Sequence, residues 1–268
     1  MNWRHAASSV LGFFAAGAGH AGPPLLTDDP VPAAPRTLES ILTFTVERRA
    51  SGQWYQLPLL DLSYGLVPDL EVGALVPWYV SDEPGTGSDT GFGHLAAHAK
   101  WRFWKTSDAT LQAAAAPALL FDTAESDVDR GASQDGFTLL APLLAQSSIA
   151  GFDVGLDLTF LWRPTGPDVW LTGLAVSREV FGGASLLAEL TTESGHDLSD
   201  TDVAFTAGLH WAVHQRLHLL ASWGRRVRRG SDDRLHWRAY VGLQLISGPF
   251  GRRRDPTAER RGRPGGGR

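Results

Sequence analysis

The sequence predicts an all-β protein, a transmembrane antiparallel up-and-down β-barrel of about twelve strands. Three observations predict this fold: runs of ten to twelve residues in which apolar side chains alternate with polar or small ones, an even number of such runs, and connections that are alternately short and long. Alternation with a period of two is typical of a strand with two unlike faces. Even strand numbers and alternating loop lengths are typical of outer-membrane barrels.

Three runs show the alternation most clearly, at residues 152–162, 203–213 and 235–245. In the first run the apolar positions alternate with Asp153, Asp157 and other polar or small residues. Each run is about twice the ~5–6 residues of an ordinary globular strand. The length is close to the ~9–11 residues that a tilted strand needs to cross a bilayer. These runs are therefore predicted to be membrane-crossing strands.

Weaker alternation predicts the remaining strands. The stretch 61–80 is a hairpin that turns at Val67-Pro68-Asp69, and its second strand covers residues 70–80. The other predicted strands lie at residues 37–47, 53–64, 92–104, 109–121, 136–148, 169–178, 184–193 and 217–224. With the three clear runs this makes twelve strands, which places both ends of the barrel on the periplasmic side.

The connections between the predicted strands differ in length at the two ends of the barrel. If the first strand runs outward, the periplasmic turns are Gly65–Pro68, Lys105–Asp108, Ile149–Gly151, Glu179–Gly183 and His214–Arg216, all of them short. Two of the outer connections, Ser81–Thr90 and Asp122–Asp135, are long and rich in Gly, Ser and Asp. Short periplasmic turns and longer outer loops are expected of this kind of barrel.

The segments outside the predicted barrel, residues 37–251, have distinct compositions. Residues 1–21 fit a secretory signal peptide, with Arg4 before an apolar run and small residues at the cleavage site. Residues 22–36 are irregular and rich in Pro, and we expect them to plug the periplasmic mouth of the barrel. Residues 252–268 hold seven Arg and no apolar period, which predicts a disordered basic tail.

Composition narrows the function classes. The chain has no Cys, so that disulfides and thiolate metal sites are excluded. No segment offers the ~18 apolar residues of a transmembrane helix. The formal net charge of −5 includes the basic tail, so the barrel itself is more acidic than the whole chain. An exported acidic barrel is not expected to bind nucleic acid.

The two faces of the predicted strands settle which side faces lipid. The second face carries Gly, Ala, Asp, His and Arg, whereas a soluble sandwich usually presents a solvated Lys, Glu and Thr surface. We therefore expect the apolar face to contact lipid and the mixed face to line a narrow lumen. Eight tryptophans near the strand ends fit an interfacial girdle: Trp54, Trp78, Trp101, Trp104, Trp162, Trp170, Trp211 and Trp237.

The candidate site is the set of charged residues on the inward face. The candidate lumen-lining residues are Glu39, Glu71, Lys100, Arg102, Asp153, Asp157, Arg163, Glu189, His210, His236 and Arg238. Rings of such side chains can set the charge selectivity of a pore. The same residues could instead pair across strands and hold the barrel together.

Other chemistry finds little support in the sequence. His94 and His98 lie on one strand about 13 Å apart, too far to share a metal ion. His218 and His236 are expected at opposite ends of the barrel. The sequence has no G-x-S-x-G element and no phosphate-binding glycine pattern. We therefore predict no enzyme, no metal site and no cofactor.

Several short motifs resemble a known family. They are Pro24–Pro30 followed by Glu39, then Tyr64-Gly65-Leu66, Pro77, Gly91-Phe92-Gly93 and Lys100-Trp101-Arg102-Phe103. In this order they resemble the outer-membrane β-barrel family of transporters of the meta-pathway of phenol degradation, up to about Gly251. One position departs, because the family usually has Asp where this chain has His94. The resemblance implies a channel or transporter for small solutes, hydrophobic or aromatic ones among them.

The sequence thus predicts a channel of the bacterial outer membrane that contacts lipid and passes small solutes by passive diffusion. Two alternatives stay open at this point. One is a structural or adhesion barrel that acts through its outer loops without transport. The other is a secreted soluble β-sandwich or β-barrel protein with the apolar face as its core. The sequence leaves the solute and the oligomeric state open.

Overall fold

The computed structural model describes residues 23–49, 52–83, 87–121, 137–164, 168–196, 198, 201–228 and 235–249. The predicted signal peptide, the long outer connection at 122–135 and the basic tail lie outside these residues. Within the described ranges there is no helix with the length and hydropathy that a membrane crossing requires.

The described residues form one antiparallel sheet of fourteen hydrogen-bonded segments. They are β1 (Leu38–Arg49), β2 (Gln53–Val67), β3 (Leu70–Glu83), β4 (Gly87–Phe92), β5 (Leu95–Lys105), β6 (Leu111–Ala115), β7 (Ala118–Phe121), β8 (Phe137–Ile149), β9 (Phe152–Trp162), β10 (Val169–Phe181), β11 (Ala184–Gly195), β12 (Thr201–His214), β13 (Leu217–Arg228) and β14 (Leu235–Ser247).

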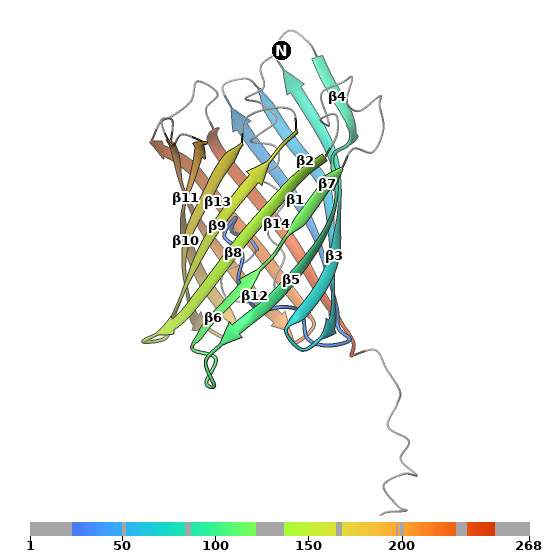
Figure 1. Ribbon diagram of the computed structural model, residues 1–268. Helices are drawn as coiled ribbons and strands as arrows, with labels where there is room; N and C mark the ends of the chain where they lie inside the picture. Colours follow the sequence, from blue (N-terminus) through green and yellow to red (C-terminus); the bar gives the residue numbers. More distant parts are fainter. Residues whose placement is uncertain are drawn as a thin grey trace, which may run out of the picture.

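The sheet closes into a barrel of twelve strands, as predicted (Figure 1). The first and last strands pair antiparallel, from Leu38 opposite Ser247 to Arg49 opposite Leu235. Around the rest of the barrel each strand pairs with its neighbour in sequence, and β3 pairs with β5. Closure leaves no open edge at this seam, which is what a sheet surrounded by lipid requires.

Two of the predicted strands are each split into two segments. The predicted strand 92–104 corresponds to β5 and the last residue of β4, with a break at Gly93-His94. The predicted strand 109–121 corresponds to β6 and β7, with a break at Ala116-Pro117. Proline has no N–H to give to the ladder, so a break there is expected. The outer connection expected at 81–90 is wrong in extent, because β3 continues to Glu83 and β4 begins at Gly87.

The apolar face of the sheet points outward. On β9 Leu156 and Leu158 are 54% and 44% exposed, whereas Leu161, on the opposite face, is fully buried. On β14 Val241, Leu243 and Leu245 are likewise exposed. This pattern is the reverse of a soluble protein, so the alternative with an apolar core behind a solvated face is wrong. The outer face is the lipid-contacting face of an outer-membrane barrel.

The two ends of the barrel differ as predicted. Five tight turns gather at one end, including Pro68-Asp69, Ala150-Gly151 and Gly182-Gly183, and the wider connections lie at the other end (Figure 1). We call these the turn end and the loop end, and the turn end is periplasmic by the general organisation of such barrels. Half-exposed Trp101 and Trp104 lie near the turn end of β5, where an interfacial girdle is expected.

Candidate functional site

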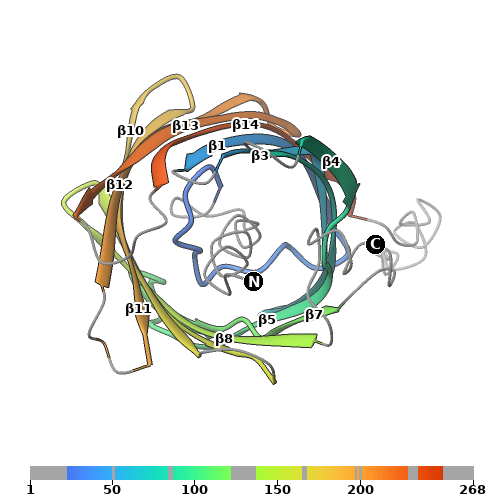
Figure 2. The ribbon, with the colours of Figure 1, turned by 90° about the horizontal axis from the view of Figure 1, so that it is seen from above.

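The lumen is crossed by residues Pro23–Thr37, which we call the inner segment. Seen from above, this segment runs inside the ring of strands (Figure 2). Glu189 on β11 is 2% exposed and accepts hydrogen bonds from the backbone N–H groups of Leu26 and Thr27, at 3.0 and 2.9 Å, and from the Thr27 hydroxyl at 3.0 Å. One buried carboxylate therefore holds the segment deep in the barrel.

Further anchors come from strands around the barrel. Buried Lys100 on β5 donates to Asp28 at 3.0 Å and lies 3.9 Å from a Glu71 oxygen. Glu71 on β3 in turn accepts the backbone N–H of Ala33. Side-chain groups of the barrel thus satisfy polar groups of the segment, as burial in a lumen demands.

Residues on β13 and β9 also contact the inner segment. The Ser222 hydroxyl on β13 donates to the Pro24 carbonyl at 2.7 Å. On β9, the Asp157 carboxylate accepts a hydrogen bond from the Thr159 hydroxyl at 2.6 Å and lies beside the backbone of Asp28. The inner segment is therefore tied to strands on several sides of the barrel.

Glycines on the inner face make room for this segment. A Cβ atom at Gly173 on β10 would overlap the Thr27 side chain. A Cβ atom at Gly208 on β12 would lie 3.1 Å from Pro24 Cγ, closer than ordinary contact. The glycines noted in the strand sequences therefore reflect a close approach of the segment to the wall.

A chain of polar side chains lies at the turn end of β12, β13, β14 and β1. His210 Nε2 lies 3.0 Å from His218 Nδ1, which lies 3.2 Å from Gln244 Oε1. The Gln244 amide then donates to Glu39 at 3.0 Å. His218 and Gln244 were not among the predicted lumen residues, although both occupy inward positions of their strands. In the described part of the chain no three His, Asp or Glu side chains are arranged to hold a metal ion.

The loop-end half of the lumen has a charged wall, formed by Glu47, Arg49, Glu193, Asp202, Arg226 and Arg238 on β1 and β11–β14. Glu47 pairs with Arg49 at 2.7 Å and with Arg238 at 3.0 Å, and Asp202 pairs with Arg226. These residues, except Glu47, line a cavity of about 40 Å³ next to Leu26. Predicted Arg238 thus lies in a cross-strand ion-pair network.

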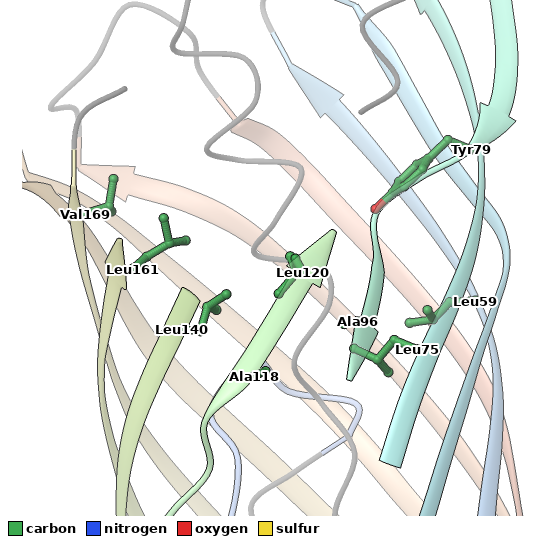
Figure 3. Close-up of a cluster of buried hydrophobic side chains, with 9 residues drawn as sticks. All are labelled: Leu59, Leu75, Tyr79, Ala96, Ala118, Leu120, Leu140, Leu161 and Val169. Atoms are coloured by element: carbon green, nitrogen blue, oxygen red, sulfur yellow. The ribbon is translucent and has the colours of Figure 1, made fainter. Parts of the chain in front are cut away.

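The opposite side of the lumen has an apolar wall. It is formed by buried Leu59, Leu75, Tyr79, Ala96, Ala118, Leu120, Leu140, Leu161 and Val169, on the consecutive strands β2, β3, β5, β7, β8, β9 and β10 (Figure 3). Sequence reasoning missed this wall, because it assigned the inward face a polar role. The signal was present at Leu75 and Leu161, which are apolar residues at inward positions.

The other predicted lumen residues lie nearer the rims. Arg102 donates to Asp69 at the turn end, and Asp153 accepts from Ser148 beside the turn at 150–151. Arg163 is buried just beyond the loop end of β9. His236 is exposed at the loop end of β14, where the register with β1 shifts. The predicted lumen residues therefore lie at the turn end, around the inner segment and at the loop end, and do not form one ring.

Asp69 offers a pH-dependent test of the turn end. Hydrogen bonds from Lys105 and Arg102 hold the pKa of Asp69 below its usual value of 3.8. A carboxylate whose native pKa is lowered stabilises the fold above its unfolded-state pKa, and this contribution is lost as the pH falls through the native pKa. Asp69→Asn is therefore expected to destabilise the barrel at pH 7 and to lose this effect in acid.

Urea unfolding in detergent micelles, at pH 7 and in acid, measures the free energy of unfolding of the original protein and of Asp69→Asn. Asn suits the substitution because it tolerates the positive φ of 70° at this position. Ser63→Ala, at another polar position of the same hairpin, serves as a control without a charge. An equal destabilisation by Asp69→Asn at both pH values would contradict the proposed role of the ion pairs.

The chain matches a known protein family over most of the barrel. The sequence profile of the family described as "Putative MetA-pathway of phenol degradation" matches residues 53–243. The chain belongs to this family. The match covers most of the barrel, from the start of β2 into β14, and confirms the resemblance noted in the sequence motifs. No curated protein sequence matches the chain.

Solved structures show the same fold at low identity. An outer membrane channel from Pseudomonas putida F1 is 13% identical, with a TM-score of 0.67 over 82% of this chain and 98% of that one. The NanC porin is 9% identical, with a TM-score of 0.57, and the KdgM porin is 11% identical, with a TM-score of 0.54; each comparison covers 76% of this chain and 98% of the porin. All three are outer-membrane barrels, and the family member described here is likewise a protein of the bacterial outer membrane.

Proposed function

We propose that the protein is a channel through which small solutes, hydrophobic or aromatic ones among them, diffuse passively across the outer membrane. The observation that carries this proposal is the apolar wall inside the barrel. A barrel that served only as a membrane anchor or adhesin would need no apolar surface on its inner face. The aromatic or aliphatic body of a solute gains free energy when it leaves water and packs against this apolar wall.

The inner segment sets how open this passage is. The two cavities beside Leu26 measure about 40 Å³ each. Such a volume holds about three water molecules, at ~10–15 Å³ each. A solute of the size of phenol therefore passes only when the segment shifts, and we propose that the segment acts as an internal plug. We expect this plug to begin at the turn end, where the Arg36 N–H donates to the Gly65 carbonyl at 2.7 Å, and to reach from there into the lumen.

The proposal is non-enzymatic. The similar structures reported above are a channel and two porins, which supports this proposal. The partners are then outer-membrane lipid on the outer face and a small solute in the lumen.

Planar-bilayer recording tests the proposal with protein purified from the outer membrane. We expect discrete conductance steps, and we expect benzyl alcohol, but not glycerol at equal concentration, to reduce the ion current by occupying the apolar wall. Leu161→Asn should weaken this block. Absence of conductance steps both from the full chain and from a chain lacking the inner segment would favour a structural or adhesion barrel.

A further inference from the structure

The loop-end half of the lumen joins an apolar wall to a charged one. We infer that it binds amphipathic carboxylates, solutes with an aromatic or aliphatic body and one carboxylate group. This inference rests on the proposed channel function and names the solute class of that channel. It is carried by Arg163, which is buried just beyond the loop end of β9, two residues from Leu161 of the apolar wall and in the field of Glu193 of the charged wall.

The Arg163 side chain is buried, and two of its three nitrogen atoms have no hydrogen-bond partner among the described residues. The residue is 4% exposed, and its Nε and Nη2 atoms are buried without a hydrogen bond. Its backbone N–H donates to Asp168 at 3.3 Å. The carboxylates of Glu193 and Asp168 act on the guanidinium only through their fields, and among the described residues neither forms an ion pair with it within 4.0 Å. A buried guanidinium without a carboxylate is costly, so this position calls for an anionic partner.

The acidic residues nearby are already engaged with other cations. Glu47 is held by Arg49 and Arg238, and Asp202 by Arg226. Glu193 lies in the fields of Arg49, Arg163 and Arg226 together. Among the described residues, Arg49, Arg226 and Arg238 each pair with a carboxylate of the wall and Arg163 does not, so a carboxylate supplied by a solute would complete the pairing. The planar fork of Arg matches a carboxylate with two parallel hydrogen bonds.

The position of Arg163 also determines where the body of the solute would lie. Leu161 of the apolar wall is two residues away and faces the same side of the strand. Leu161 pairs in register with Val169, and Leu171 on the same strand pairs with Glu193. The apolar wall and the charged wall therefore meet at β10 and β11. A carboxylate bound by Arg163 has its attached ring or chain against Leu161 and Val169.

Current block in planar bilayers tests this inference with three probes. Benzoate has both features, benzyl alcohol has the body without the charge, and acetate has the charge with little body. We expect benzoate to block at the lowest concentration. Arg163→Gln should lower the preference for benzoate over benzyl alcohol about tenfold, the equivalent of about 1.4 kcal/mol. Leu161→Ala should weaken both aromatic probes and leave the response to acetate as it was.

Arg178→Gln is the matched control, because Arg178 lies over the Phe152 ring at the turn end, 4.7 Å from its centroid. This variant should keep the benzoate preference. Equal block by benzoate and benzyl alcohol, or an unchanged preference in Arg163→Gln that still runs as a heat-modifiable barrel, would overturn the inference and leave the channel intact. Failure of every probe together with absence of conductance would instead contradict the channel function itself.

Discussion

Removing residues 23–36 is expected to raise the single-channel conductance severalfold. The inner segment lies within the lumen, and two cavities lined by its residue Leu26 measure about 40 Å³ each. Its anchors, such as Glu189 and Lys100, are side chains of the wall and stay in place when it is removed. Planar-bilayer recording of the two chains at the same salt concentration measures the change. Unchanged conductance would show that the segment does not obstruct the passage.

Point substitutions separate obstruction by the segment from a general effect of shortening the chain. Glu189→Gln keeps the shape of the side chain but removes the charge that receives three hydrogen bonds from Leu26 and Thr27. Hydrogen bonds to charged groups contribute about 1.5–3 kcal/mol each, so the segment should leave its closed position more often. Frequent brief openings are expected in the recordings. Glu179→Gln, at an exposed turn, serves as the control and should show the same frequency of openings as the original protein.

The second large effect is expected from a charge on the lipid-facing surface. Leu156 lies near the middle of β9 and is 54% exposed to what is the bilayer core. Leu156→Arg should lower the free energy of unfolding in lipid vesicles by about 2–4 kcal/mol, the cost of Arg at the midplane of an outer-membrane barrel. Urea titration with tryptophan fluorescence as the signal measures this loss.

Position along the strand provides the control for that substitution. Ile149→Arg places the same side chain on an outward position at the turn end, where the residue is 60% exposed. The cost near the interface falls to about 0–1 kcal/mol. Equal destabilisation by both substitutions would contradict the assignment of the outer face to the bilayer.

Most of the barrel could be predicted from the sequence, for a physical reason. Successive side chains of a strand point to opposite faces, so the sequence alternates with a period of two. Lipid on one side requires apolar side chains at outward positions such as Leu156, Leu158 and Val241. The break at Ala116-Pro117 is predictable as well, since proline interrupts a ladder, whereas the break at Gly93-His94 contains no proline.

The interior could be predicted only in part. The sequence placed Glu189 and Lys100 on the inward face, but nothing local indicates that they hold Thr27 and Asp28, which lie far away in the chain. Inward position was also taken to imply polarity, and this assumption concealed the apolar wall around Leu161. The inner face contacts water, a peptide segment and, as we propose, a solute, so that its composition follows no single rule.

The attachment of the inner segment bears on the order in which the protein assembles. Its hydrogen bonds join residues very far apart in sequence, 163 positions between Leu26 and Glu189 and 198 between Pro24 and Ser222. Contacts between residues so far apart in sequence form late, because the entropy cost of closing a long loop comes before the contacts add stability. The segment also precedes β1, so it is synthesised before every strand that holds it. Biogenesis therefore has to keep the inner segment free of other partners until the strands that anchor it have formed.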